Sequence, residues 1–207
     1  MSERPHWWSG SVRGVLLFVR TRRLVAVLVA TVSLSLLLGW VRDLTVAVPF
    51  APDTTTVDLY LLTPVFVAAL AGATLGAPLA AWEQLAQHRM VWLRGLHLAV
   101  LLVAVVVMAL PVGGKPLGEL PAVVRNGMVL VAVVLVWGVL IEATIAWLTA
   151  VLFAALCFFV GKGGADGGAR GWALLVRGFD APTAASATVL FMVAAAIYIR
   201  WGPQRDT

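Results

Sequence analysis

Charged residues are scarce in this chain of 207 residues. Asp, Glu, Lys and Arg make up 12% of it, against about a quarter of an ordinary soluble domain. The hydrophobic fraction is 61%, and the mean hydropathy is +0.97. This composition excludes the ordinary soluble classes and indicates a chain built for a lipid bilayer.

Motifs that carry chemistry are lacking too. The only cysteine, Cys157, lies in an apolar stretch, cannot form an intramolecular disulfide, and is interpreted as a packing residue. The sequence has no G-x-x-x-x-G-K-[ST] phosphate loop, no H-E-x-x-H and no G-x-S-x-G. Its three histidines are scattered. We therefore predict no catalytic, cofactor or metal site, and we do not expect an enzyme. Ionisable groups inside membrane spans usually mark ion or proton paths. The only candidates within or beside the apolar stretches are His97 and Glu142.

Long uncharged stretches are what the sequence has in abundance. Crossing a bilayer takes about 17–25 mostly apolar helical residues, and helices satisfy their own backbone in lipid. The predicted fold is therefore all-α, a polytopic membrane protein with six transmembrane helices. The predicted spans are 24–42, 59–82, 94–112, 122–141, 143–161 and 182–201. Only Glu142 separates the fourth stretch from the fifth, which predicts a tight hairpin near Ile141–Ala143; one kinked, tilted helix is the alternative.

The distribution of Lys and Arg predicts the orientation. With six spans both termini lie on one side, which carries nine arginines, while the other side carries six basic residues, Arg125 among them. An excess of Lys and Arg marks the cytoplasmic face, so both termini are predicted to be cytoplasmic. The chain then divides into an interfacial segment 1–23, a membrane domain 24–201 and a tail 202–207. Cytoplasmic loops facing anionic lipid explain the net charge of +5, and no nucleic-acid partner is expected.

Two cytoplasmic segments offer contacts to a partner. In residues 5–20, apolar side chains recur at helical spacing with Arg13 and Arg20 beside them, which predicts an amphipathic interfacial helix. This helix serves either as a topology anchor or as a contact with a cytoplasmic protein. The loop 83–94 has no glycine or proline, so it can be helical throughout. This predicts either a docking helix or an extension of the neighbouring spans. Its polar groups are Glu83, Gln87, His88 and Arg89.

The outer connections carry fewer signals. Residues 41–58 and 110–121 read as loops because of their prolines, glycines and threonines. The apolar octet 172–179 is too short to span and is expected in the outer interface or as a re-entrant piece. Asp180 and Pro182 predict the start of the last helix. In the second span, Gly72 and Gly76 form a G-x-x-x-G pair, which predicts close helix packing or a dimer contact.

This layout resembles the membrane subunit of an ABC transporter of the type-2 exporter family. The features that carry the resemblance are the basic start that runs through Arg22 and Arg23 into Leu24, the six spans, the helix containing Glu83, the fourth–fifth hairpin and the octet before the last span. The resemblance implies that the N-terminal helix and the first cytoplasmic loop contact a separate ATPase, which binds ATP and Mg. It also implies a second permease copy, identical or not, and short helices that re-enter before the sixth span.

The sequence thus predicts a permease subunit of an ATP-driven exporter that forms its pathway as a dimer. Thirteen Arg against two Lys, with abundant Ala, Val and Gly, favour a GC-rich bacterial genome and hence the bacterial cell membrane. Two alternatives stay open. One is a non-transporting membrane scaffold or immunity protein, which needs no ATPase. The other is a membrane-embedded enzyme, which would need more converging polar groups inside the spans.

Overall fold

The computed structural model confirms the predicted all-α class. It describes residues 16, 18–20, 22–41, 44–47, 56–58, 62–75, 87–111, 119–143, 145–161 and 169–203. The helices longer than ten residues in these ranges are α2 (Leu24–Trp40), α3 (Thr63–Leu75), α5 (Gln87–Ala109), α6 (Glu119–Leu140), α7 (Ala146–Val160) and α8 (Ala181–Trp201). Leu16 and residues 18–20 are also helical.

Three of these helices are long and apolar enough to cross a membrane. They are Met90–Ala109 within α5, Glu119–Leu140 and Ala181–Trp201. The apolar helices α2, α3 and α7 have 17, 13 and 15 residues, at or below the usual length of a span. The long helices indicate a membrane protein, whereas six crossings and cytoplasmic termini stay predictions.

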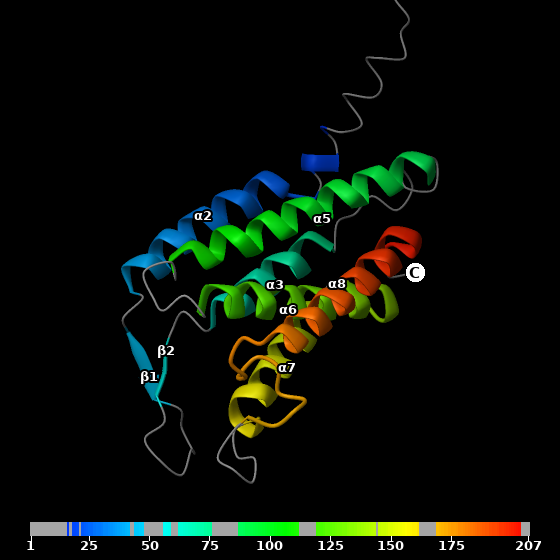
Figure 1. Ribbon diagram of the computed structural model, residues 1–207. Coiled ribbons are helices and arrows are strands. Elements are labelled where there is room, and N and C mark those ends of the chain that lie inside the picture. The colour runs from blue at the N-terminus through cyan, green and yellow to red at the C-terminus, as the bar shows by residue number, and fades with distance from the viewer. Residues whose placement is uncertain are drawn as a thin grey trace, which may run out of the picture.

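The helices run alternately in opposite directions along one bundle (Figure 1). We call the end where α2, α5 and α7 begin the proximal end, and the opposite end the distal end. α6 lies at the centre and packs against α3, α5, α7 and α8, while α2 packs at the periphery against α5 and α3. Helix α6 ends at Leu140 and α7 begins at Ala146, where the hairpin is predicted, and α7 packs back on α6.

Side chains of α6 form the middle of the hydrophobic core. Leu130, Ala132 and Leu135 are completely buried there. The outer helices instead expose apolar side chains, such as Leu36 of α2 and Leu152 of α7. An apolar exterior of this extent is what a bilayer covers, so the bundle is built with its polar groups at the ends and inside.

Two local features differ from the sequence-based expectation, and a third agrees with one of its alternatives. A short antiparallel ribbon, β1 (Thr45–Ala47) and β2 (Thr56–Asp58), lies inside the predicted loop 41–58, since its Thr and Val residues favour strands. Helix α5 begins at Gln87 and continues unbroken into the span, which agrees with the extension of the span predicted as one alternative for residues 83–94. The octet 172–179 forms turns and no helix, whereas the resemblance implies a helix.

Candidate functional site

His97 connects three helices at the proximal end. Its ring lies on α5 and is completely buried. Its Nδ1 lies 2.7 Å from the hydroxyl of Tyr198 on α8, and its Nε2 lies 2.8 Å from Oγ1 of Thr74 on α3. We call His97, Thr74, Tyr198 and the neighbouring Arg22 the proximal network. A single side chain thus holds α3, α5 and α8 in register.

The hydrogen bonds of Thr74 fix where the protons of this network lie. Its hydroxyl donates to the carbonyl of Ala71 at 2.6 Å. Its oxygen must therefore accept from His97, so we place the His97 proton on Nε2. The bare Nδ1 then accepts from the Tyr198 hydroxyl. In this arrangement His97 is neutral and both ring nitrogens are satisfied.

Arg22 attaches the segment before α2 to the end of α3. Its side chain is 1% exposed, and Nη1 donates to the carbonyls of Thr74 and Leu75 at 2.9 and 2.7 Å. The last carbonyls of a helix lack partners within the helix and carry partial negative charge, so a guanidinium there is doubly favourable. The same guanidinium lies 5.7 Å from the ring centroid of Phe18.

Phe18 is the hydrophobic counterpart of this attachment. It is buried in a cluster with Leu24 of α2 and with Met90 and Leu93 of α5. Nearby, Arg94 Nη1 donates to the carbonyl of Ile199 at 2.9 Å, and its guanidinium lies so close to Gly202 that a Cβ there would clash. Phe18 and Arg22, the start of α5 and the end of α8 are therefore packed together.

The predicted partner-contact residues divide as follows. Arg20 is exposed on the helical piece next to Phe18. Gln87, His88 and Arg89 form the first turn of α5. Arg13, Glu83 and Gly76 lie outside the described residues. Gly72 is buried inside the chain, where a Cβ would stand 2.5 Å from Cβ of Trp147 on α7, so its face is occupied by another helix of the same subunit.

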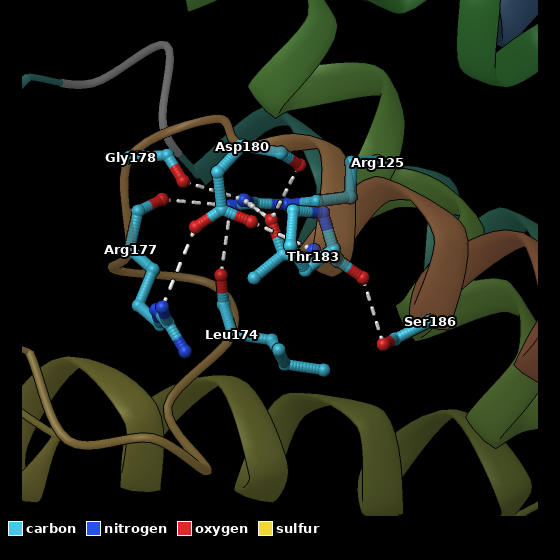
Figure 2. Close-up of polar contacts among 8 residues, drawn as sticks. Arg125, Leu174, Arg177, Gly178, Asp180, Thr183 and Ser186 are labelled. Carbon is cyan, nitrogen blue, oxygen red and sulfur yellow. Dashed lines mark hydrogen bonds and ion pairs between the residues drawn. The ribbon is translucent and has the colours of Figure 1, made fainter.

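A second polar cluster lies at the distal end, around Arg125 of α6 (Figure 2). Arg125 is 3% exposed and donates to the carbonyls of Leu174, Arg177 and Gly178 at 2.7 to 2.8 Å. It also donates to Oγ1 of Thr183 at 3.0 Å and to Oδ1 of Asn126. These bonds engage every N–H group of the guanidinium. The direct partners of the cation are all neutral oxygens.

The neighbours of Arg125 complete this distal network, by which we mean Arg125, Asn126, Thr183 and the backbone of residues 174–178. Asn126 Nδ2 donates to the carbonyl of Leu175 at 2.9 Å. Asp180 caps α8 by accepting from the backbone N–H of Thr183 at 2.7 Å, and it pairs with Arg177 at 3.4 Å. Hydrogen bonds from the side chain and backbone of Thr183 hold the pKa of the Asp180 carboxyl below its ordinary value.

The structure adds the surroundings of Arg125 to what the sequence predicted. Arg125 was predicted within the span 122–141 and counted with the basic residues of the outer side, and the structure buries it in the second turn of α6. The reason is that the turn 172–179 folds over the helix and supplies backbone carbonyl acceptors, which a sequence pattern does not predict. The sequence did contain one sign of this cluster, the adjacent Arg125 and Asn126 in an apolar helical stretch. An ionisable group inside a span usually has a polar partner within the protein.

The two intramembrane candidates have different surroundings. His97 is at the centre of the proximal network. Glu142 lies half-buried in the turn between α6 and α7, and its carbonyl accepts from the N–H of Ala146 at 3.1 Å. Among the described residues, no three of His, Cys, Asp and Glu come together as metal ligands would. Both polar networks are thus clamps between helices, one at each end of the bundle.

Comparison with protein-family models, with curated proteins and with solved structures found no match to this chain. Its function is therefore argued from the two networks and the surfaces around them.

Proposed function

We propose that this chain is the permease subunit of an ATP-driven exporter of the ABC class, acting in the bacterial cell membrane. In this proposal the chain crosses the membrane six times with both termini in the cytoplasm, and it forms a substrate pathway together with a second permease copy. A separate ATPase, which binds ATP and Mg, docks on residues 5–20 and 83–94.

The observation that carries the proposal is the packing of Phe18 against Met90 and Leu93. It joins the end of one predicted docking segment to the other, so a partner that moves either segment moves both. His97 then links the start of α5 to α3 and α8. Because Thr183 and Tyr198 lie about 22 Å apart along α8 at 1.5 Å per residue, a displacement at the proximal end reaches the distal network through one rigid helix.

The proposal is tested by co-purifying the intact chain with its ATPase from the native host. A photo-crosslinking residue at Gln87 or His88 is expected to capture a protein that carries a phosphate-binding loop. Reconstituted in lipid nanodiscs, that protein should hydrolyse ATP faster with the permease than without it.

Charge reversal of an exposed residue sharpens the test. Arg20→Glu is expected to abolish the crosslink and the stimulation, since Arg20 is solvent-exposed and its replacement leaves the core intact. Arg170→Glu, which reverses an exposed arginine at the distal end, is the matched control and should change neither. Recovery of the folded chain with no ATPase at either crosslinking position would overturn the proposal in favour of a non-transporting scaffold or immunity protein.

A further inference from the structure

The proximal end carries most of the positive charge of the described chain. Its charged side chains that the structure describes are those of five arginines and one glutamate, formally +4: Arg20, Arg22, Arg23, Arg94, Arg200 and Glu142. Those described at the distal end belong to three arginines and two acids, formally +1: Arg125, Arg170, Arg177, Glu119 and Asp180. The two ends of one apolar bundle therefore differ in their described charge.

Two of the proximal arginines are exposed outside the predicted docking segments. Arg23 stands at the start of α2, and Arg200 lies in the last turn of α8. In the part of the chain that the structure describes, the closest basic–acidic pair is Arg177 with Asp180 at the distal end, and neither Arg23 nor Arg200 has a carboxylate within 4.0 Å. The Arg200 guanidinium instead lies 5.9 Å from the ring centroid of Trp201.

Two exposed tryptophans lie at the same end of the bundle. Trp92 in the second turn of α5 is 64% exposed, and Trp201 at the end of α8 is 63% exposed. Indole rings with one wet and one apolar side concentrate at headgroup depth in membrane proteins. Arginines at the same end as such tryptophans suit contact with lipid phosphates.

We propose that the proximal end binds anionic phospholipid headgroups through Arg23 and Arg200. Anionic lipid is the occupant that the charge selects, because exposed arginines beside an apolar bundle attract an anionic leaflet, by about fivefold in binding for each arginine near the surface. Arg125 and Arg177 cannot serve in this way at the distal end, since the first is engaged by carbonyls and the second by Asp180.

The test uses the full chain in a neutral detergent, with no ATPase present. Short-chain phosphatidylglycerol and phosphatidylcholine are titrated separately, and lipid occupancy is measured by native mass spectrometry beside the melting temperature. We expect phosphatidylglycerol to bind at least tenfold more tightly than phosphatidylcholine, and the preference to shrink at 1 M salt, where the Debye length is about 3 Å.

Variants locate the binding surface. The double variant Arg23→Gln with Arg200→Gln is expected to lose most of the preference, since each arginine contributes about fivefold, whereas Arg170→Gln at the distal end should keep it. Equal binding of the two lipids, or an equal loss in Arg170→Gln, would overturn the proposal. Stabilisation by inorganic phosphate to the same extent would likewise show that a free anion, and not a lipid, is the occupant. All these readouts are independent of transport.

Discussion

At the scale of single residues, Arg125 shows how a cation is kept inside an apolar bundle. Its acceptors come from the backbone of the turn 174–178 and from Asn126 and Thr183, and each N–H of the guanidinium is used. Because a hydrogen bond to a charged group is worth about twice a neutral one, this single side chain fixes the turn on α6.

Replacing Arg125 by Leu should therefore release the turn. The carbonyls of Leu174, Arg177 and Gly178 would lose their donor, at roughly 1–3 kcal/mol for each group left buried and unsatisfied. We expect the amides of residues 170–178 to exchange with deuterium much faster than in the parent chain. Arg177→Gln is the control, since its half-exposed pair with Asp180 contributes about 0–1 kcal/mol. Unchanged amide exchange in Arg125→Leu would refute the claim that Arg125 fixes the turn on α6.

Tyr198→Phe tests the proton arrangement of the proximal network. The variant keeps the ring but removes the hydroxyl that donates to His97 Nδ1, which costs about 1–3 kcal/mol of stability for a buried acceptor left alone. Chemical unfolding measures the loss. Thr188→Val, which removes an exposed hydroxyl bonded within its own helix, should have little effect. Equal stability of Tyr198→Phe and the parent would contradict the assignment.

Arg23 has a backbone conformation that suits another residue type. Its φ is 53° and its ψ is 30°, in the left-handed region. For residues other than glycine this conformation costs about 1–2 kcal/mol, so Arg23→Gly is expected to stabilise the chain by about 1 kcal/mol in neutral detergent. Arg23→Ala keeps the strain and is the control. Calorimetry that finds the glycine variant no more stable than the alanine variant would sink this explanation.

At the scale of elements, apolar length and end signals predicted much of the helical framework. Asp180 and Pro182 predicted the start of α8, and the helix indeed begins at Ala181 with Asp180 as its N-cap. The ribbon β1–β2 and the turn 172–179 were not predictable in the same way. Both depend on contacts between segments distant in sequence, such as Thr45 opposite Asp58, and local patterns do not contain such contacts.

The contact between α3 and α7 is open to a direct test. Because a Cβ on Gly72 would stand 2.5 Å from Cβ of Trp147, Gly72→Val should push the helices apart and destabilise the chain by about 1–3 kcal/mol. Gly95 on α5 has nothing within 4 Å of the same position. Gly95→Ala should therefore stabilise by about 0.5–1 kcal/mol through helix propensity. Thermal unfolding of both variants measures these changes. Unchanged stability of Gly72→Val would contradict the close approach of α3 and α7.

At the scale of the whole molecule, the alternating helices separate two differently charged ends. That separation predicts which residues lie on which side of the membrane. With Cys157→Ser as background, Arg200→Cys should be shielded from a membrane-impermeant maleimide in intact cells and react after permeabilisation. Arg170→Cys should react in both conditions. Equal labelling of the two positions in intact cells would contradict the crossing of α8, and the reverse pattern would contradict the orientation.

The candidate site illustrates the limits of the sequence at this scale. His97 could be singled out as an ionisable group within an apolar stretch, but its partners Thr74 and Tyr198 lie 23 and 101 residues away. The burial of Arg125 was not predictable for the same reason, because its backbone acceptors begin at Leu174, 49 residues further on. Packing brings these groups together, so spacing along one chain cannot reveal them.

The backbone-only grip of Arg125 on its turn has a consequence for how this segment can change over generations. Three of its acceptors are main-chain oxygens of Leu174, Arg177 and Gly178, which any amino acid would supply. Side-chain identity at these positions can drift while the grip persists. An insertion or deletion between them would shift the oxygens out of reach of Arg125. The segment should therefore tolerate substitutions but not changes in length.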